Sequence, residues 1–164
     1  GIAYALGKGL MPWEKESAAR HLPTYLAGII YHAGIFSAVL YTLALAADIL
    51  PSRAVLSAVQ LLLAAGFLSG AGLLLKRARH PRMRSLSCPD DYLSNLVVDG
   101  FILAGLLTAH SLLPVSFFLA AAILTFLAMP LGKIRHCFFF FYTRIVFGLH
   151  FGRRGALPGS GREA

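Results

Sequence analysis

The stretch RHLPTYLAGIIYHAGIFSAVLYTLALAA (residues 20–47) decides the fold class of this chain. Its apolar run is long enough to cross a bilayer as one helix, since a crossing takes about 20 apolar residues. One histidine, His32, falls about two turns inside this run. An ionisable side chain at that depth is costly, which indicates a functional role. The stretch therefore predicts a membrane helix that carries a functional histidine.

The composition extends this prediction to the whole chain of 164 residues. Charged residues make up only 13% of it and hydrophobic residues 57%, whereas a soluble domain has about 25% charged residues. We therefore expect an all-α membrane protein, a transmembrane helical bundle. Its four full spans are expected at about 23–47, 54–75, 93–112 and 115–135. The opening GIAYAL resembles the tail of an apolar helix, so we also expect a truncated fifth span at the N-terminus.

One domain is expected for most of the chain. Residues 1–152 form a single membrane bundle in this interpretation. It includes a C-terminal interfacial helix within CFFFFYTRIVFGLHFGRRG (137–155), where four phenylalanines precede basic residues. Residues 153–164 are expected to be a disordered tail.

Lysines and arginines are distributed very unequally between the two sides of this predicted bundle. Fourteen of the fifteen fall before the first span, in the middle loop or in the C-terminal segment from Lys133 onward. Arg53 is the one that falls on the other side. The positive-inside rule therefore places the N-terminus, the middle loop and the C-terminus in the cytoplasm. The net charge of +8 then reflects membrane topology, and no nucleic-acid partner is expected.

His136 is the partner that we predict for His32. It ends the fourth apolar run, so both histidines fall in the cytoplasmic half of the membrane on antiparallel helices. Such a pair provides bis-histidine ligation of one haem b, and Gly28, one turn before His32, lets a flat macrocycle approach the helix. No C-x-x-C-H attachment motif is present, so axial ligation would hold the haem. The alternative is that both imidazoles bind backbone carbonyls or face water.

Asp99 lies about two turns into the third span. It could serve as a proton relay or quinone-binding group, because intramembrane carboxylates are rare and commonly functional. Alternatively, it is protonated and bonded to a neighbouring helix. Both interpretations stay open from the sequence.

Three runs resemble the gamma subunit of respiratory nitrate reductase. They are YHAGIFSAVLY (31–41), LLLKRARHPRMRSLSCPDDYLSNLVVDGFILAGLL (73–107) and LTFLAMPLGKIRHCFF (124–139). They share with that family a helix with a histidine, one residue and a glycine, and a basic cluster with a Pro-Arg-x-Arg element. They also share a last helix with a proline, a basic residue and the ligand histidine. The superfamily includes the cytochrome b subunits of sulfite-reduction-associated and heterodisulfide-reductase-like complexes.

The resemblance implies an electron-transfer subunit in a prokaryotic inner (cytoplasmic) membrane. It would pass electrons between a quinone, menaquinone or ubiquinone, and iron–sulfur and catalytic subunits on the cytoplasmic face. Its role is that of a subunit of a quinone-linked oxidoreductase rather than a stand-alone enzyme. Arg77 and Arg79 occupy the place where the family pairs arginines with haem propionates, although the basic loop could serve topology alone. Thr42 and Phe118 replace the family's other two ligands, so only the cytoplasmic-side haem is expected, and the family's quinol site beside the outer haem is in doubt.

Two other functions compete with this interpretation. A haemless membrane anchor would need the same spans but no ligands, and an optical spectrum separates it from a cytochrome. A small transporter is disfavoured, because the spans carry few polar groups and show no matched pair of broken helices.

Overall fold

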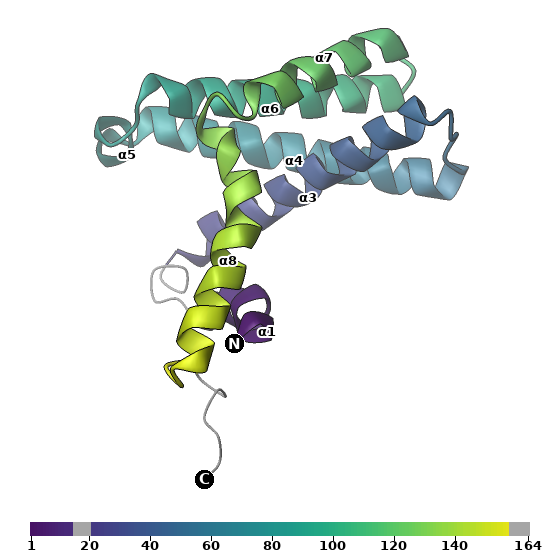
Figure 1. The fold of residues 1–164 in the computed structure, drawn as a ribbon. Coiled ribbons are helices and arrows are strands. Elements are labelled where there is room, and N and C mark those ends of the chain that lie inside the picture. Colours follow the sequence, from purple (N-terminus) through teal and green to yellow (C-terminus); the bar gives the residue numbers. More distant parts are fainter. Residues whose placement is uncertain (15–20, 158–164) are drawn as a thin grey trace. The chain divides into compact units, whose positions relative to one another are not determined.

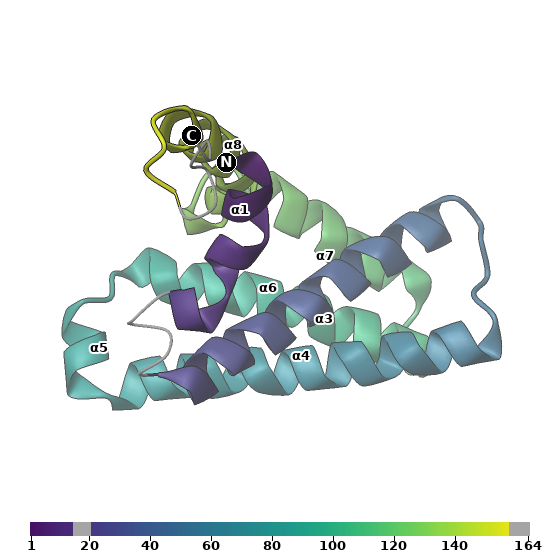
Figure 2. The ribbon, with the colours of Figure 1, turned by 90° about the horizontal axis from the view of Figure 1, so that it is seen from below.

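The computed structural model describes residues 1–14 and 21–157, which group into two compact units. The larger unit is Leu26–Ile134, and the smaller unit combines Gly1–Tyr25 with Arg135–Ala164. Helices form the regular structure of the described residues in both (Figures 1 and 2), which confirms the predicted all-α class. The single domain expected over 1–152 stays a prediction.

The larger unit is built from a succession of helices connected by short turns (Figure 1). In chain order they are α3 (Leu22–Ala46, whose first turn belongs to the smaller unit), α4 (Arg53–Arg79), the short α5 (Pro81–Ser85), α6 (Pro89–Ala109) and α7 (Val115–Ala128). Asp48 and Ser111 have φ of 57° and 59° in the turns after α3 and α6. Both residue types tolerate tight turns.

Helices α3, α4 and α6 are each long and apolar enough to cross a membrane. They coincide closely with the first three predicted spans. The fourth prediction, 115–135, is shown only in part, because α7 has 14 residues and passes the same test only together with Lys133–Arg153. Pro130 explains the early end, since proline lacks the N–H that would continue the helical hydrogen-bond ladder after Met129. Within the described residues, length and composition thus give three helices that could span a membrane, or up to four if the bent pair counts as one span.

The helix starts follow from local capping chemistry. The Ser52 hydroxyl accepts a hydrogen bond from the Val55 backbone N–H at the start of α4. Helix α6 starts with Cys88 as its N-cap and Pro89 in its first turn, and the Asp91 carboxylate accepts from the Cys88 N–H at 2.9 Å. These contacts satisfy donors that have no partner inside the helix.

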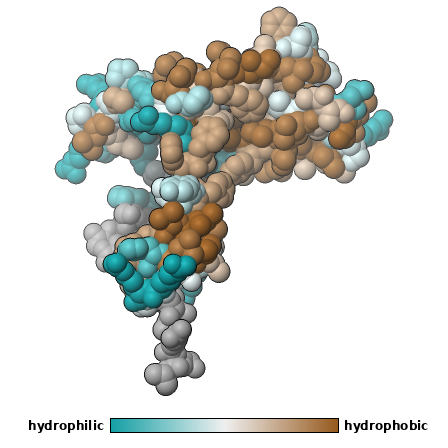
Figure 3. Space-filling model, viewed as in Figure 1, coloured by the Kyte–Doolittle hydropathy of each residue, from teal (hydrophilic) through white to brown (hydrophobic). Residues whose placement is uncertain are grey.

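The core of the larger unit is aromatic. Phe118 on α7 is fully buried and stacks on Tyr41 of α3 and Phe101 of α6, with both pairs of ring centroids 5.5 Å apart. Leu63 of α4 and Ile102 of α6 complete this fully covered layer. Many other large apolar side chains are exposed, and Figure 3 shows the visible face of these helices as largely hydrophobic with hydrophilic residues gathered towards their ends. An exposed apolar surface of this extent fits a lipid environment.

The smaller unit is organised around α8 (His136–Arg153), which follows the 3-10 turn Lys133–Arg135. The helix α1 (Ile2–Leu6) packs on it so closely that a Cβ on Gly148 would lie 2.6 Å from the Cα of Ile2. The 3-10 turns Lys8–Leu10 and Pro12–Glu14 follow α1.

Two predictions concern the smaller unit and the ends of the chain. The truncated fifth span falls on the five residues of α1 and stays a prediction. Of the tail predicted to be disordered, 158–164 lie outside the described residues, and Arg153 is the last residue of α8.

Candidate functional sites

His32 lies on an exposed face of α3, near the exposed side chain of Phe36. Its Nδ1 is 2.7 Å from the backbone carbonyl oxygen of Gly28. A carbonyl oxygen only accepts, so Nδ1 carries the hydrogen and, in the neutral ring, Nε2 carries the lone pair. Among the described residues, none outside the neighbouring helix backbone would lie within 4 Å of a Cβ added to Gly28, so there is open space at this position one turn before His32.

His136 is exposed and is the first residue of α8. It belongs to the smaller unit, whereas His32 belongs to the larger one. The pairing of these two residues on one iron atom therefore stays a prediction.

Thr42 and Phe118, which stand where the resembled family has its other two haem ligands, lie inside the larger unit. The Thr42 hydroxyl donates to the carbonyl oxygen of Ala38 at 2.8 Å and is buried. Phe118 is the central ring of the aromatic core. Both side chains therefore contribute to packing where the family would place imidazoles.

Asp99 takes part in a polar cluster formed by three helices. The Asn95 Nδ2 group donates to Asp99 Oδ2 at 3.0 Å and to the Tyr31 hydroxyl at 2.9 Å. Gly70 of α4 faces this cluster, because a Cβ added there would collide with Asp99 Oδ1 and the Tyr31 ring. Asp99 is only 5% exposed. The cluster thus places one carboxyl, one amide and one phenol together among apolar helices.

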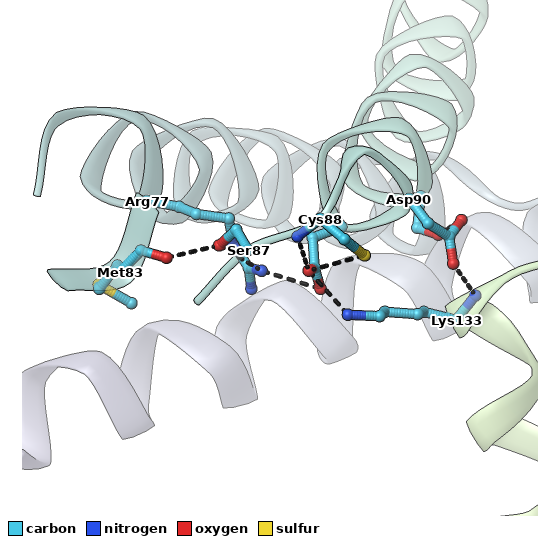
Figure 4. Close-up of polar contacts among 8 residues, drawn as sticks. Arg77, Met83, Ser87, Cys88, Asp90 and Lys133 are labelled. Carbon is cyan, nitrogen blue, oxygen red and sulfur yellow. Dashed lines mark hydrogen bonds and ion pairs between the residues drawn. The ribbon is translucent and has the colours of Figure 1, made fainter. Parts of the chain in front are cut away.

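A second polar cluster joins the start of α6 to the end of α4 and to the segment after α7 (Figure 4). Asp91 Oδ1 lies 2.9 Å from Arg77 Nη1, and Lys133 Nζ donates to Asp91 Oδ2 at 2.7 Å. The backbone N–H of Lys133 donates to Asp90 Oδ2 at 2.9 Å. A Cβ added to Gly132 would lie 2.7 Å from Asp90 Oδ1, so a larger residue there would require the Asp90 carboxylate to move. These contacts tie together the end of the unit that the charge distribution predicts to be cytoplasmic.

The charge balance of this second cluster affects Asp91. Asp91 precedes the apolar stretch 93–112. The hydrogen bond from Lys133 lowers the pKa of the Asp91 carboxyl well below the usual range. The Cys88 backbone N–H and the nearby Arg77 guanidinium act in the same direction. Asp91 is therefore ionised at neutral pH.

The two arginines predicted to bind haem propionates differ in their surroundings. Arg77 is partly covered, pairs with Asp91 and lies 3.4 Å from the Ser87 hydroxyl. Arg79 is exposed in the last turn of α4. The contact with Asp91 gives Arg77 a structural role, and the propionate assignment of both residues stays a prediction.

No protein-family model, curated protein or solved structure matches this chain. The resemblance to the nitrate reductase gamma subunit therefore stays a prediction.

The sequence identified Asp99 but missed its partners Tyr31, Asn95 and Gly70. One signal was available, because Asp91, Asn95 and Asp99 are spaced four residues apart and so share one face of α6. Tyr31 of α3 and Gly70 of α4 could not be predicted from spacing within one helix, because their contacts with Asp99 depend on how neighbouring helices align.

Proposed function

We propose that this chain is a b-type cytochrome subunit of a multi-subunit respiratory oxidoreductase. It passes electrons between a membrane quinone, menaquinone or ubiquinone, and an iron–sulfur partner on the cytoplasmic face. The proposal places four spans in a prokaryotic inner membrane, with the middle loop and the C-terminus in the cytoplasm. One haem b is held by His32 and His136.

The observation that carries this proposal is the hydrogen bond from His32 Nδ1 to the Gly28 carbonyl oxygen. Axial histidines commonly donate one ring N–H to a backbone carbonyl, which fixes the tautomer and leaves the other nitrogen to bind the metal. The space beside Gly28 suits a flat macrocycle lying along α3. This tautomer of His32 therefore supports its proposed role as an axial ligand.

Each part of the chain has a separate task in this proposal. The haem, when bound, supplies one-electron transfer. The chain supplies the two imidazoles and an apolar surrounding that excludes water. Exposed arginines near the cytoplasmic end, such as Arg79, would pair with the haem propionates. Axial ligand identity and burial then set the reduction potential.

The test is the optical spectrum of the purified full-length chain, reduced with dithionite after growth with a haem precursor. We expect a b-type spectrum in the wild type that is lost in His32→Ala and in His136→Ala. His80→Ala is the matched control, because His80 is exposed in the loop between α4 and α5, and it should leave the spectrum unchanged.

A colourless wild-type protein that is folded, as judged by circular dichroism, would overturn the proposal. The chain would then be the haemless anchor of its complex. Co-purification of iron–sulfur and catalytic subunits with the tagged chain tests the partner assignment separately.

A further inference from the structure

The carboxyl of Asp99 is the buried polar group that the proposed haem site does not use. It is 5% exposed, and its Oδ1 has no hydrogen-bond partner among the described residues. Oδ2 accepts from Asn95 Nδ2. An ionised carboxylate with an unpaired oxygen is expensive to bury, and more so inside a bilayer. A proton on Oδ1 removes that cost.

The packing around this oxygen has the character of a built site. Gly70 on α4 leaves the space that Asp99 Oδ1 and the Tyr31 ring occupy, and a Cβ at this position would force both side chains to move. Tyr31 donates to the Asn95 backbone carbonyl at 3.4 Å and accepts from its side-chain amide. Three helices thus hold the carboxyl in one orientation.

Polar residues follow one face of α6 from its first turn to Asp99. Asp91, Asn95 and Asp99 follow one another at one-turn intervals on the same face. A rise of 1.5 Å per residue places Asp99 about 12 Å along the axis from Asp91. Asp91 lies in the first turn of α6, where its carboxylate meets Arg77 and Lys133. Asp99 therefore lies two helical turns from the start of α6.

Few other titratable groups surround Asp99. On α3 the group that faces it is Tyr31, while His32 lies on an exposed face of that helix. The ionisable residues of α4 are at its two ends, and α7 (Val115–Ala128) contains none. On α6 itself the others are Asp90, Asp91 and Tyr92, two turns away. Protonation of Asp99 is therefore governed by burial and by its contacts with Tyr31 and Asn95.

We propose that Asp99 is an exchangeable proton-binding site within the membrane-spanning part of this chain, with Tyr31, Asn95 and Gly70 as its positioning residues. A proton from water at the start of α6 binds Asp99 Oδ1 and converts the carboxylate into a neutral carboxyl group. Release reverses the step, and no electron moves. The site does not depend on haem.

The test is infrared difference spectroscopy of the full chain in lipid nanodiscs, between about pH 5 and pH 9, a range outside that of ordinary carboxyls. We expect a carbonyl stretch from a protonated carboxyl that titrates within this range, shifts in deuterated water and disappears in Asp99→Asn. Asp48→Asn is the matched control, because Asp48 is exposed in the turn after α3, and it should keep the band. The haem spectrum, recorded on the same samples, tests the proposed function independently.

Tyr31→Phe keeps the carboxyl and removes the hydroxyl that shares the Asn95 amide. It should shift the midpoint of the titration by about one pH unit, and it supplies a test if Asp99→Asn does not fold. Absence of a titrating band in the wild type would overturn the proposal. A band of constant intensity across the range would also overturn it, since Asp99 would then be a permanently protonated structural group.

Discussion

Gly34 on α3 and Gly66 on α4 face each other so closely that a Cβ added to either would lie 2.7 Å from the Cα of the other. The two backbones are therefore in contact at this point. Lipid tails are as apolar as the helices, so association depends on packing of this kind rather than on a hydrophobic driving force. This contact also aligns Tyr31 with Gly70, one turn from each glycine.

Gly66→Ala tests that contact. The added methyl group must separate α3 from α4, and we expect the free energy of unfolding to fall by about 1–3 kcal/mol. The measurement is equilibrium unfolding in mixed micelles. Gly72→Ala on the same helix is the control, because nothing lies within 4 Å of its added Cβ, and alanine there should be neutral or stabilising by up to about 1 kcal/mol. Equal losses in the two variants would contradict the role of the contact.

Adjacent phenylalanines on α7 provide a second matched pair. Phe118 is fully buried between Tyr41 and Phe101, whereas Phe117 is 63% exposed. Phe118→Ala should lower the free energy of unfolding by about 3 kcal/mol through the cavity that it leaves. Phe117→Ala should have little effect in detergent. A Phe118→Ala protein as stable as the Phe117→Ala protein would show that the aromatic core is not formed.

The ion pairs of Asp91 predict a dependence of stability on pH. Because Lys133 lowers the pKa of Asp91 in the folded chain, the stabilisation is complete above the ordinary carboxyl pKa of about 3.8 and is lost as the pH falls below it. Asp91→Asn keeps an acceptor for the Cys88 N–H but removes the charge. We expect it to lower the unfolding temperature by a few °C at pH 7 and to flatten the acid side of the stability profile. Thermal melts at several pH values measure this, and an unchanged profile would argue against the pairing.

Arg79 and Arg77 should respond differently to loss of charge. Arg77→Gln breaks the pair with Asp91, so its effect should appear in thermal stability at neutral pH. Arg79→Gln leaves that pair intact, and in the proposed cytochrome it should change the haem midpoint potential or haem retention without changing the melt of the haem-free chain. Potentiometric titration and thermal melts of both variants measure the two effects. If Arg79→Gln has a wild-type potential and wild-type haem content, the propionate assignment is wrong.

The proposed orientation predicts which side of the membrane exposes Cys88. Its side chain is exposed, just before α6. In a Cys137→Ser background, a membrane-impermeant maleimide should label Cys88 in inside-out vesicles and not in intact spheroplasts. A single cysteine placed at Ser52, in the turn before α4, is the reverse control and should react only from the outside. Labelling of Cys88 in intact spheroplasts would contradict the proposed orientation.

Most of the fold could be predicted from the sequence because a long apolar run has few alternatives to a membrane helix. Helices α3, α4 and α6 begin and end within a few residues of the predicted spans, with Ser52 and Pro89 marking two of the starts. The fourth prediction, 115–135, is shown only in part, because hydropathy does not register that Pro130 interrupts the hydrogen-bond ladder after α7.

The candidate sites were harder to predict than the helices. His32 and Asp99 could be identified one at a time, since each is an ionisable residue within an apolar run. The relation of Asp99 to Tyr31 and Gly70 depends on the register of two helix hairpins. That register follows from small-residue contacts such as that between Gly34 and Gly66, which no local pattern in one helix reveals.

The space that Gly70 leaves for Asp99 links the permitted volumes of two positions on different helices. A larger residue at 70 collides with both Asp99 and the Tyr31 ring, so Asp99→Ser removes one of the two collisions and should partly suppress the damage caused by Gly70→Ala. Such second-site rescue would make these positions an example of compensatory substitution, and related chains should vary them jointly.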